Sequence, residues 1–305
     1  MKFSPKQTAF GRHETFALRY SWLPKGFHQL SKSVTSLDKD DATVKLGVGK
    51  NMVLSIKYWL KACQLVDSVN QPTDLGRLIF DEDCGLDPYL EDEATIWLIH
   101  WLIATNPNQA TSWFWFFNKY HKPVFTSLEL TTALGDWVRD VMLDGKQPSA
   151  STLKNDAQLI HRMYCQSTVS TRMPLEEVLD SPLSLLRLVN QAGGKELHSK
   201  LEARPGLPVR IFGFAVLSLM NERSMKAMPL DELMYSRAEF PAPGPIFRLT
   251  ENDLITKLEQ LVMKYPKTFE IRETAGVHQL YLLHAMSPEQ LLEDHYSKSR
   301  DGVVV

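Results

Sequence analysis

The feature that most constrains this chain is a glycine-containing turn followed at once by an amphipathic, basic helix, over residues 45–61. Apolar side chains recur at helical spacing along this helix and form one stripe. They are Met52, Ile56, Trp59 and Leu60. The polar side chains beside this stripe are Lys45, Lys50, Asn51, Ser55, Lys57 and Lys61. A cationic helix start with short polar side chains suits phosphates and the edges of bases, so the pattern predicts that residues 45–57 bind DNA.

The same residues allow two other interpretations. A phosphate-binding P-loop requires Gly-x4-Gly-Lys-Ser/Thr, and Gly49-Lys50 fits its second half. However, Val44 stands at the first glycine position and Asn51 at the position of the magnesium-coordinating hydroxyl, which disfavours a nucleotide loop. The second interpretation is an ordinary helix with a solvated lysine face, since helix faces are commonly charged.

The composition is that of an ordinary soluble protein. Hydrophobic residues make up 44% and charged residues 23% of the 305 residues, which is enough for about two or three domains. No run of eighteen apolar residues predicts a membrane span, and residues 1–6 lack the apolar core of a signal peptide. Cys63, Cys84 and Cys165 are far apart and form no Cys-x-x-Cys pair, which argues against structural zinc. We therefore expect a reduced, cytoplasmic protein.

The net charge of −2 conceals a strong polarity along the chain. Residues 1–61 contain eleven lysines and arginines against four acidic residues, whereas residues 67–93 contain one arginine against nine acidic residues. A local basic segment binds phosphates whatever the charge of the whole chain. The charge pattern therefore agrees with DNA binding near the N-terminus.

The first part of the chain has the organisation of a helix-turn-helix. We expect helices over residues 22–34, 42–46 and 50–65, the last two joined by the glycine-containing turn. Residues 73–80 are then expected to form a small strand or wing. Together these elements predict a winged-helix-like unit at the N-terminus.

The middle of the chain is expected to be helical. The predicted helices cover residues 94–104, 111–120, 127–143, 153–165, 182–192 and 210–222, with a linker over residues 144–151. The proline-rich residues 241–245 indicate a boundary. Beyond it, a helix over residues 251–264 and two strands, 269–272 and 279–282, predict a second winged-helix-like unit. Its core is expected to contain Leu254, Leu258, Leu261 and Val262, packed under the hairpin.

The predicted fold class is therefore mainly α (α+β), with winged-helix-like units at both ends around a helical middle. The predicted domains are residues 1–145 (DNA-binding and helical), 146–240 (helical middle) and 241–305 (C-terminal unit).

Four stretches resemble the motifs of one bacterial family, first catalogued as a domain of unknown function. They are residues 10–23, 42–53, 87–92 and 269–281, so the resemblance covers essentially the whole chain. The family is the SspB-like family of the single-strand DNA phosphorothioation and phage-defence system. The resemblance implies a protein that nicks one DNA strand so that sulfur can replace a backbone oxygen. It also implies three protein partners: a cysteine desulfurase, an ATPase and a PAPS-reductase-like protein. No catalytic residue is transferred from the family.

His13 and Glu14 are the first candidates for nicking chemistry. In one interpretation the imidazole acts as a base or metal ligand and the carboxylate orients it, while Arg12 and Arg19 hold phosphate. In the other interpretation, which we favour, His13 and Glu14 form a structural hydrogen-bonding pair at the entry to the domain.

The acidic loop is the second candidate. Its carboxylates Asp81, Asp83, Asp87 and Asp92 are expected to bind Mg2+ or Mn2+ if they gather. The favoured alternative is a solvated loop that balances the basic segment.

Other motifs carry less weight. His198-Ser199-Lys200 matches the His-x-Lys pair of phospholipase-D-like nucleases, but Pro205 stands where their aspartate is expected. The aromatic residues 113–117 suit either stacking on bases or a core, and the core is favoured because they face all sides of a helix. His100 is expected in the core. Cys84 is expected to be an ordinary thiol, with sulfur transfer as the alternative.

The sequence thus predicts a DNA-binding protein that nicks one strand in a phosphorothioation and defence system. One alternative is a non-catalytic DNA-binding scaffold for the sulfur-transfer enzymes. Another is a winged-helix transcriptional regulator.

Overall fold

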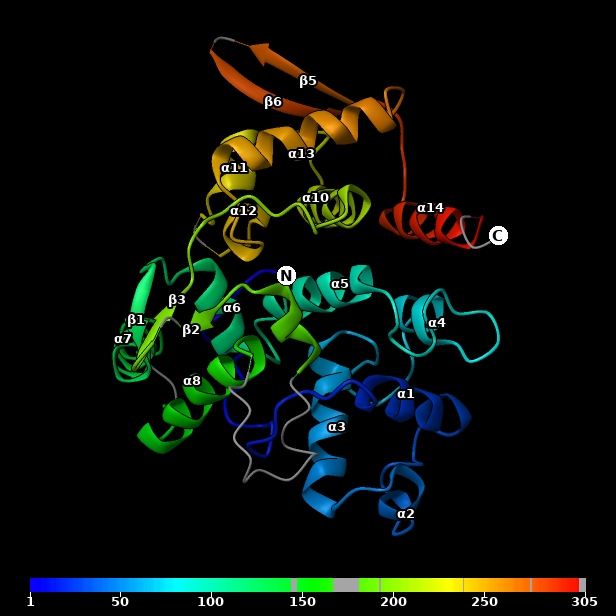
Figure 1. The fold of residues 1–305 in the computed structure, drawn as a ribbon, viewed down its shortest axis with the longest axis vertical. Coiled ribbons are helices and arrows are strands. Elements are labelled where there is room, and N and C mark those ends of the chain that lie inside the picture. Colours follow the sequence, from blue (N-terminus) through cyan, green and yellow to red (C-terminus); the bar gives the residue numbers. More distant parts are fainter. Residues whose placement is uncertain (144–146, 167–180, 192, 238, 275, 302–305) are drawn as a thin grey trace. The chain divides into compact units, whose positions relative to one another are not determined.

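The computed structural model describes residues 1–143, 147–166, 181–191, 193–237, 239–274 and 276–301 (Figure 1). The chain forms two compact units. The N-terminal unit consists of Phe3–Phe116 and Lys122–Lys200, and the C-terminal unit of Leu201–Val305 with Met1–Lys2 and Phe117–His121. The three-domain division expected from the sequence stays a prediction, and residues 144–146 of its first linker lie outside the described residues.

The N-terminal unit begins with four helices: α1 (Trp22–Lys32), α2 (Ala42–Leu46), α3 (Lys50–Ala62) and α4 (Asp74–Phe80). Helices α3 and α4 both pack on α1, and α2 packs on α3. The predicted apolar stripe explains this packing, since Ile56, Trp59 and Leu60 are buried. The three helices that the sequence predicts before residue 66 are therefore confirmed, with small differences in their ends.

The strand expected over residues 73–80 is wrong, because this segment is helix α4. The Thr73 side chain caps the helix by accepting a hydrogen bond from the Gly76 amide, and Gly76, Ile79 and Phe80 are buried at helical spacing. A Cβ at Gly76 would lie 2.3 Å from the Leu65 carbonyl oxygen, so the helix packs closely on the preceding segment. Among the described residues before Val124 there is no strand, which overturns the N-terminal winged helix.

The core of the N-terminal unit contains two strongly apolar helices, α5 (Glu93–Ala104) and α6 (Thr111–Asn118). Every residue of α5 from Ala94 onward is buried, and so are the aromatic residues 113–117. The interpretation of these aromatic residues as core is therefore confirmed, and they are not available for stacking on bases. His100 is also buried, and its Nδ1 lies 2.8 Å from the Tyr164 hydroxyl.

A small antiparallel sheet completes the N-terminal unit. Strand β1 (Val124–Thr126) is followed by α7 (Ser127–Val141), α8 (Ala150–Tyr164), the short 3-10 helix η1 (Pro182–Leu186), β2 (Asn190–Gln191) and β3 (Glu196–His198). The strand order is β1-β3-β2, with Phe125 opposite Leu197. The helix expected over residues 182–192 is thus limited to η1, and Ala192 lies outside the described residues.

The C-terminal unit has helices α10 (Val209–Glu222), α11 (Leu230–Met234), α12 (Pro243–Ile246), α13 (Glu251–Lys264) and α14 (Pro288–Asp301). Its strands are β4 (Ala227–Pro229), β5 (Phe269–Thr274) and β6 (Val277–Leu282), in the order β4-β6-β5. The predicted helix and hairpin after residue 250 are confirmed. The proline-rich residues 241–245 are buried and include most of α12, so they do not form an exposed linker.

The core predicted for this unit is largely confirmed. Leu254, Leu258 and Leu261 are buried, and α13 packs on β5. Val262 is only half-buried. In the hairpin turn Gly276 is exposed and has a φ of 77°, the left-handed conformation that glycine adopts without strain, while Ala275 lies outside the described residues.

The two sheets share one strand order. In each unit a helix, a strand, further helices and a two-stranded hairpin follow one another, and the last strand lies between the other two. Helices are the predominant elements and the strands are few and short, so the predicted mainly α (α+β) class is confirmed. No helix among the described residues is both long and apolar enough to cross a membrane.

Candidate nucleic-acid interface

The candidate site is a groove of about 770 Å³ in the N-terminal unit, called here the α2–α3 groove. Residues 19–22 and Lys25 line one side of it. Residues 43–44, residues 46–49 and Met52 line the other side. The groove thus joins the two stretches, residues 10–23 and 42–53, that carry the most specific family motifs.

The turn between α2 and α3 forms one side of the groove. Gly47 ends α2 with a φ of 68°, and the Val48 amide donates a hydrogen bond to the Thr43 carbonyl. Gly49 precedes α3, and no side chain caps the start of that helix. Uncapped amides at a helix N-terminus favour anions. A Cβ added at Gly47 or Gly49 would meet no atom within 4 Å, so a ligand can approach the backbone here.

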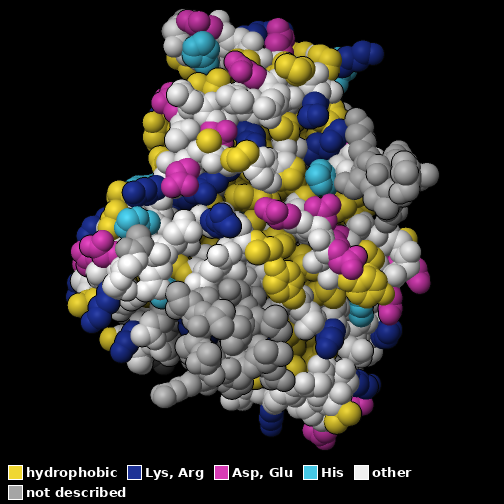
Figure 2. Space-filling model, in the orientation of Figure 1, with side chains coloured by type: hydrophobic (Ala, Val, Ile, Leu, Met, Phe, Trp, Pro, Cys, Tyr) yellow, Lys and Arg dark blue, Asp and Glu magenta, His cyan; other side chains and the backbone are white. Residues whose placement is uncertain are grey.

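The groove carries positive charge that no described carboxylate neutralises. Arg19 and Lys25 line it, and the exposed Lys50 follows the lining residue Gly49. None of the three forms an ion pair with a described residue, and no described Asp or Glu lines the groove. The Arg19 guanidinium lies 5.3 Å from the centre of the Trp22 ring. Lysine and arginine side chains are interspersed with acidic side chains over the face of the molecule that Figure 2 shows, so that face has no large, purely positive patch.

Two predicted lysine contacts are engaged within the protein. Lys45 forms an ion pair with Asp41 at 2.7 Å, and hydrogen bonding to Lys45 lowers the pKa of the Asp41 carboxyl. Lys57 forms an ion pair with Asp38 and is half-buried. The Lys45–Asp41 pair is exposed, and exposed ion pairs are weak, so this pair does not hold Lys45 firmly.

The other predicted DNA contacts differ in their exposure. Asn51 and Arg12 are exposed, and neither of them lines the groove. Ser55 is fully buried, and its Oγ has no hydrogen-bond partner among the described residues. Its burial gives the predicted contact with DNA no support, because the side chain points away from solvent on the apolar stripe of α3.

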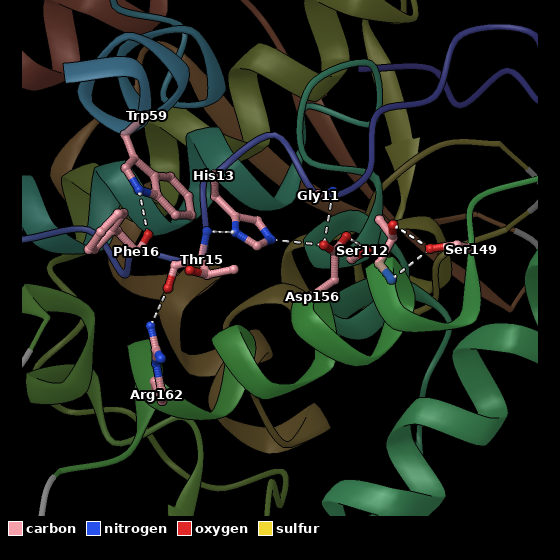
Figure 3. Close-up of polar contacts among 10 residues, drawn as sticks. Gly11, His13, Thr15, Phe16, Trp59, Ser112, Ser149, Asp156 and Arg162 are labelled. Atoms are coloured by element: carbon pink, nitrogen blue, oxygen red, sulfur yellow. Dashed lines mark hydrogen bonds and ion pairs between the residues drawn. The ribbon is translucent and has the colours of Figure 1, made fainter. Parts of the chain in front are cut away.

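His13 lies at the centre of a buried hydrogen-bond network (Figure 3). Its Nδ1 accepts a hydrogen bond from the Thr15 amide at 3.0 Å, so the proton is on Nε2, which donates to Asp156 Oδ1 at 2.8 Å. Asp156 also accepts hydrogen bonds from the Gly11 amide at 2.9 Å and from the Ser112 hydroxyl at 2.5 Å. His13 and Asp156 are each 1% exposed. These hydrogen bonds connect the first family motif, residues 10–23, to α8 through Asp156, and Asp156 in turn to α6 through Ser112.

The expected pairing of His13 with Glu14 does not occur. Glu14 is exposed and has a φ of 49°, whereas His13 points into the protein and binds Asp156. A buried imidazole with both nitrogens occupied cannot reach DNA without local opening. The geometry therefore fits the structural interpretation of His13.

The four aspartates of the acidic loop are not brought together. Asp87 is buried, and its carboxylate accepts hydrogen bonds from the Glu91 and Asp92 amides and from the Thr95 hydroxyl. Asp92 caps α5 by accepting from the Ala94 amide at 2.8 Å. Within the described ranges, no three His, Cys, Asp or Glu side chains gather as metal ligands. Asp81, Asp87 and Asp92 accept hydrogen bonds from the loop and from the start of α5, so the described carboxylates form no common site for Mg2+ or Mn2+.

Cys84 has the environment of an ordinary thiol. Its Sγ donates a hydrogen bond to Asp81 Oδ1 at 3.2 Å, and this bond raises the pKa of the thiol. The same Asp81 oxygen accepts hydrogen bonds from the Asp83 and Cys84 amides. A neighbouring carboxylate opposes the thiolate that sulfur transfer requires, so the geometry supports the alternative without sulfur chemistry.

Sequence reasoning missed two parts of the site. Lys25 and Tyr20 line the groove, but no pattern in residues 10–25 marks them. Asp156 was also missed, although a signal exists. It lies on the apolar face of α8 between Leu153 and Ile160, where an unpaired carboxylate would be costly. A charged residue on such a face indicates a buried partner, which is His13.

The fold and the groove define a mainly helical α+β protein with a basic groove in its N-terminal unit. The family model described as "Protein of unknown function (DUF4007)" matches residues 10–296, and the chain belongs to this family. It is similar to the SspB crystal structure, with 31% identity and a TM-score of 0.82 over 96% of this chain and 89% of that one. It is equally similar to the magnesium ion-bound SspB crystal structure, with 30% identity and a TM-score of 0.82 over 97% of this chain and 90% of that one. No curated protein matches the chain. The SspB-like resemblance predicted from the motifs is thus confirmed.

Proposed function

We propose that this protein is a DNA-binding component of a DNA phosphorothioation and anti-phage defence system and that the α2–α3 groove holds the DNA. The observation that supports this placement best is the pair of cations, Arg19 and Lys25, that line a groove built from both family motifs. The exposed Lys50 follows the lining residue Gly49, and none of the three cations forms an ion pair with a described carboxylate. Similarity to SspB over nearly the whole chain supports the system. Cysteine desulfurase, ATPase and PAPS-reductase-like proteins are its proposed partners.

The proposed reaction is the nicking of one DNA strand, with a divalent cation as cofactor. The likeness to a magnesium ion-bound SspB structure supports Mg2+ as that cation. The predicted set of His13, Glu14, Asp81, Asp83, Asp87 and Asp92 does not assemble a site for it. We therefore derive no step of the reaction from these residues.

The second candidate function is a non-catalytic scaffold that delivers DNA to the sulfur-transfer enzymes. The observation that favours it is the burial of His13 and Asp87, whose polar atoms are all engaged in hydrogen bonds within the protein.

Supercoiled plasmid distinguishes these functions. The full chain is incubated with the plasmid in Mg2+, in Mn2+ and in EDTA, beside the variant Lys25→Ala/Lys50→Ala. The control variant is Lys6→Ala/Lys195→Ala, which removes two exposed lysines of the same unit outside the groove. A nickase gives metal-dependent open circles that the groove variant reduces and the control does not. Binding without nicking in any metal supports the scaffold, and binding to one operator-like sequence alone supports a transcriptional regulator.

For the C-terminal unit we propose a winged-helix-like fold, supported by the strand order β4-β6-β5 and by the position of α13 under the hairpin. Arg272 and Lys267 are its proposed contacts with DNA or a partner. Both are exposed, but Arg272 forms an ion pair with Glu270 and lies over the Tyr281 ring. A packing role for this unit is the alternative, and residues 1–200 tested alone for folding and DNA binding would separate the two.

A further inference from the structure

We propose that the α2–α3 groove takes an unstacked base of a single-stranded DNA segment, with Tyr20 as the ring on which the base stacks. This inference rests on the proposed DNA binding and specifies which form of DNA the groove accepts.

The lining of the groove is more apolar than phosphate binding requires. Trp22 and Leu46 are buried within the lining, and Val48 and Met52 are half-buried beside them. Val44 and Tyr20, which also line the groove, keep 82% and 37% of their surfaces exposed. Covering such side chains with a flat aromatic base removes apolar surface from water, and base-aromatic stacking tolerates any sequence.

The cations lie where the flanking phosphates of such a base would be held. Arg19 and Lys25 line the groove on the α1 side. The exposed Lys50 lies outside the lining but directly follows the lining residue Gly49 on the α3 side. A strand whose base enters the groove carries a phosphate on either side of that base. Positive charge on both sides of an apolar lining therefore complements one nucleotide of a single strand.

A duplex matches the groove less well. Its outer surface is phosphate and sugar, which would contact the cations but leave the apolar lining exposed to water. An apolar peptide would cover the lining but would leave the cations without counter-charge. Ser21 and Thr43 also line the groove and offer hydroxyls to the polar edge of a base.

The open backbone at Gly49 provides a steric test that does not depend on removing a contact. Gly49 has a φ of −69°, which any residue adopts, and a Cβ there would meet no atom within 4 Å. Gly49→Leu should therefore fold normally while its side chain occupies space beside the groove. Gly47 is unsuitable for this purpose because its φ of 68° strains other residues.

The experiment measures binding of the full chain to one oligonucleotide in three forms: single-stranded, duplex, and single-stranded with a central abasic site. A 2-aminopurine at the same central position reports stacking by fluorescence quenching. Wild type is compared with Tyr20→Phe, Tyr20→Ala and Gly49→Leu, with Val69→Leu as a control at an exposed position outside the groove.

We expect the single strand to bind more tightly than the duplex or the abasic strand, with quenching on binding. Tyr20→Ala should weaken binding of the single strand by roughly 5- to 150-fold, as loss of one stacked base does. Gly49→Leu should weaken it as well, whereas Tyr20→Phe and Val69→Leu should not.

Equal binding of duplex and single strand, with no effect of Tyr20→Ala or Gly49→Leu, overturns the base-binding groove while leaving DNA binding intact. Absence of binding to every form of DNA overturns both this inference and the proposed function. Loss of a protein partner in the groove variants, with DNA binding unchanged, identifies a peptide as the occupant and also overturns the inference.

Discussion

The buried carboxylate of Asp156 should be one of the most sensitive positions for the stability of the N-terminal unit. It accepts three hydrogen bonds, from Gly11, His13 and Ser112, and is 1% exposed. Each hydrogen bond to a charged group contributes about 1.5–3 kcal/mol, but bonds to one acceptor are not additive. Asp156→Ala leaves the buried donors of His13 and Ser112 and the part-buried Gly11 amide without an acceptor, and we expect a loss of about 3–5 kcal/mol.

Thermal unfolding followed by circular dichroism at pH 7 measures this loss. For a unit of this size a loss of about 3–5 kcal/mol lowers Tm by roughly 6–20 °C. Asp156→Asn keeps the shape and one acceptor oxygen, so it should lower Tm less than Asp156→Ala. The control is Asp140→Ala, an exposed carboxylate on α7, which should change stability by about 0.5 kcal/mol or less. A Tm of Asp156→Ala within about 1 °C of wild type would refute this account of the network.

Three further predictions each test one interaction of the structure. Alanine usually stabilises a helix interior, but Gly76→Ala should destabilise the protein because its Cβ would lie 2.3 Å from the Leu65 carbonyl oxygen. Urea unfolding measures the sign of the change in the free energy of unfolding, and a gain in stability would show that α4 does not pack as described. Hydrogen bonds from Lys122 and from the Thr126 amide hold the pKa of Glu129 at about 2, below its usual 4.5. The stabilisation of the folded state by the Glu129 carboxylate is therefore complete above about pH 4.5 and is lost as the pH falls toward 2. The free energy of unfolding of Glu129→Gln should therefore fall less than that of wild type when both are titrated across that interval. Equal losses would show that this carboxylate does not contribute. His13→Gln should lower Tm and reduce plasmid nicking only in proportion to the folded fraction; normal Tm with abolished nicking would restore the catalytic interpretation.

The local elements follow closely from the sequence. The apolar stripe of Met52, Ile56, Trp59 and Leu60 predicts α3, and the aromatic residues 113–117 predict a buried helix. The hairpin around Gly276 is predicted because alternating residues flank a glycine. Each of these patterns depends only on residues that are neighbours along the chain.

Hydrogen bonds and close contacts, both local and non-local, explain what the sequence did not predict. Residues 73–80 suit a strand by composition, but the Thr73 cap and the contact of Gly76 with Leu65 favour a helix. His13 looks like a catalytic residue until Asp156, which is 143 residues away, is seen to bind it. Asp87 looks like a metal ligand until the amides of Glu91 and Asp92 are seen to satisfy it. Periodicity and composition do not identify these partners as a pair, although the apolar face of α8 indicates that Asp156 has a buried partner.

Figure 3 shows how the first family motif, residues 10–23, is held in place, because His13 and Gly11 form hydrogen bonds with Asp156. A short distance along the chain, Arg19 and Tyr20 line the groove. One stretch of sequence thus combines a buried anchor with one side of the α2–α3 groove, the proposed DNA-binding surface. The anchor keeps the groove residues in place while α2 and α3 provide the opposite side.

The salt dependence of DNA affinity tests the central claim most directly. The binding constant for a defined duplex and for the matching single strand is measured across a series of salt concentrations. Wild type is compared with Lys25→Ala/Lys50→Ala and with the charge-matched control Lys6→Ala/Lys195→Ala. The account predicts that the groove variant loses affinity and that its slope falls by about 0.7–0.9 for each lysine that contacts a phosphate, whereas the control keeps the wild-type slope. Equal slopes for the two double variants would contradict the placement of DNA in the α2–α3 groove.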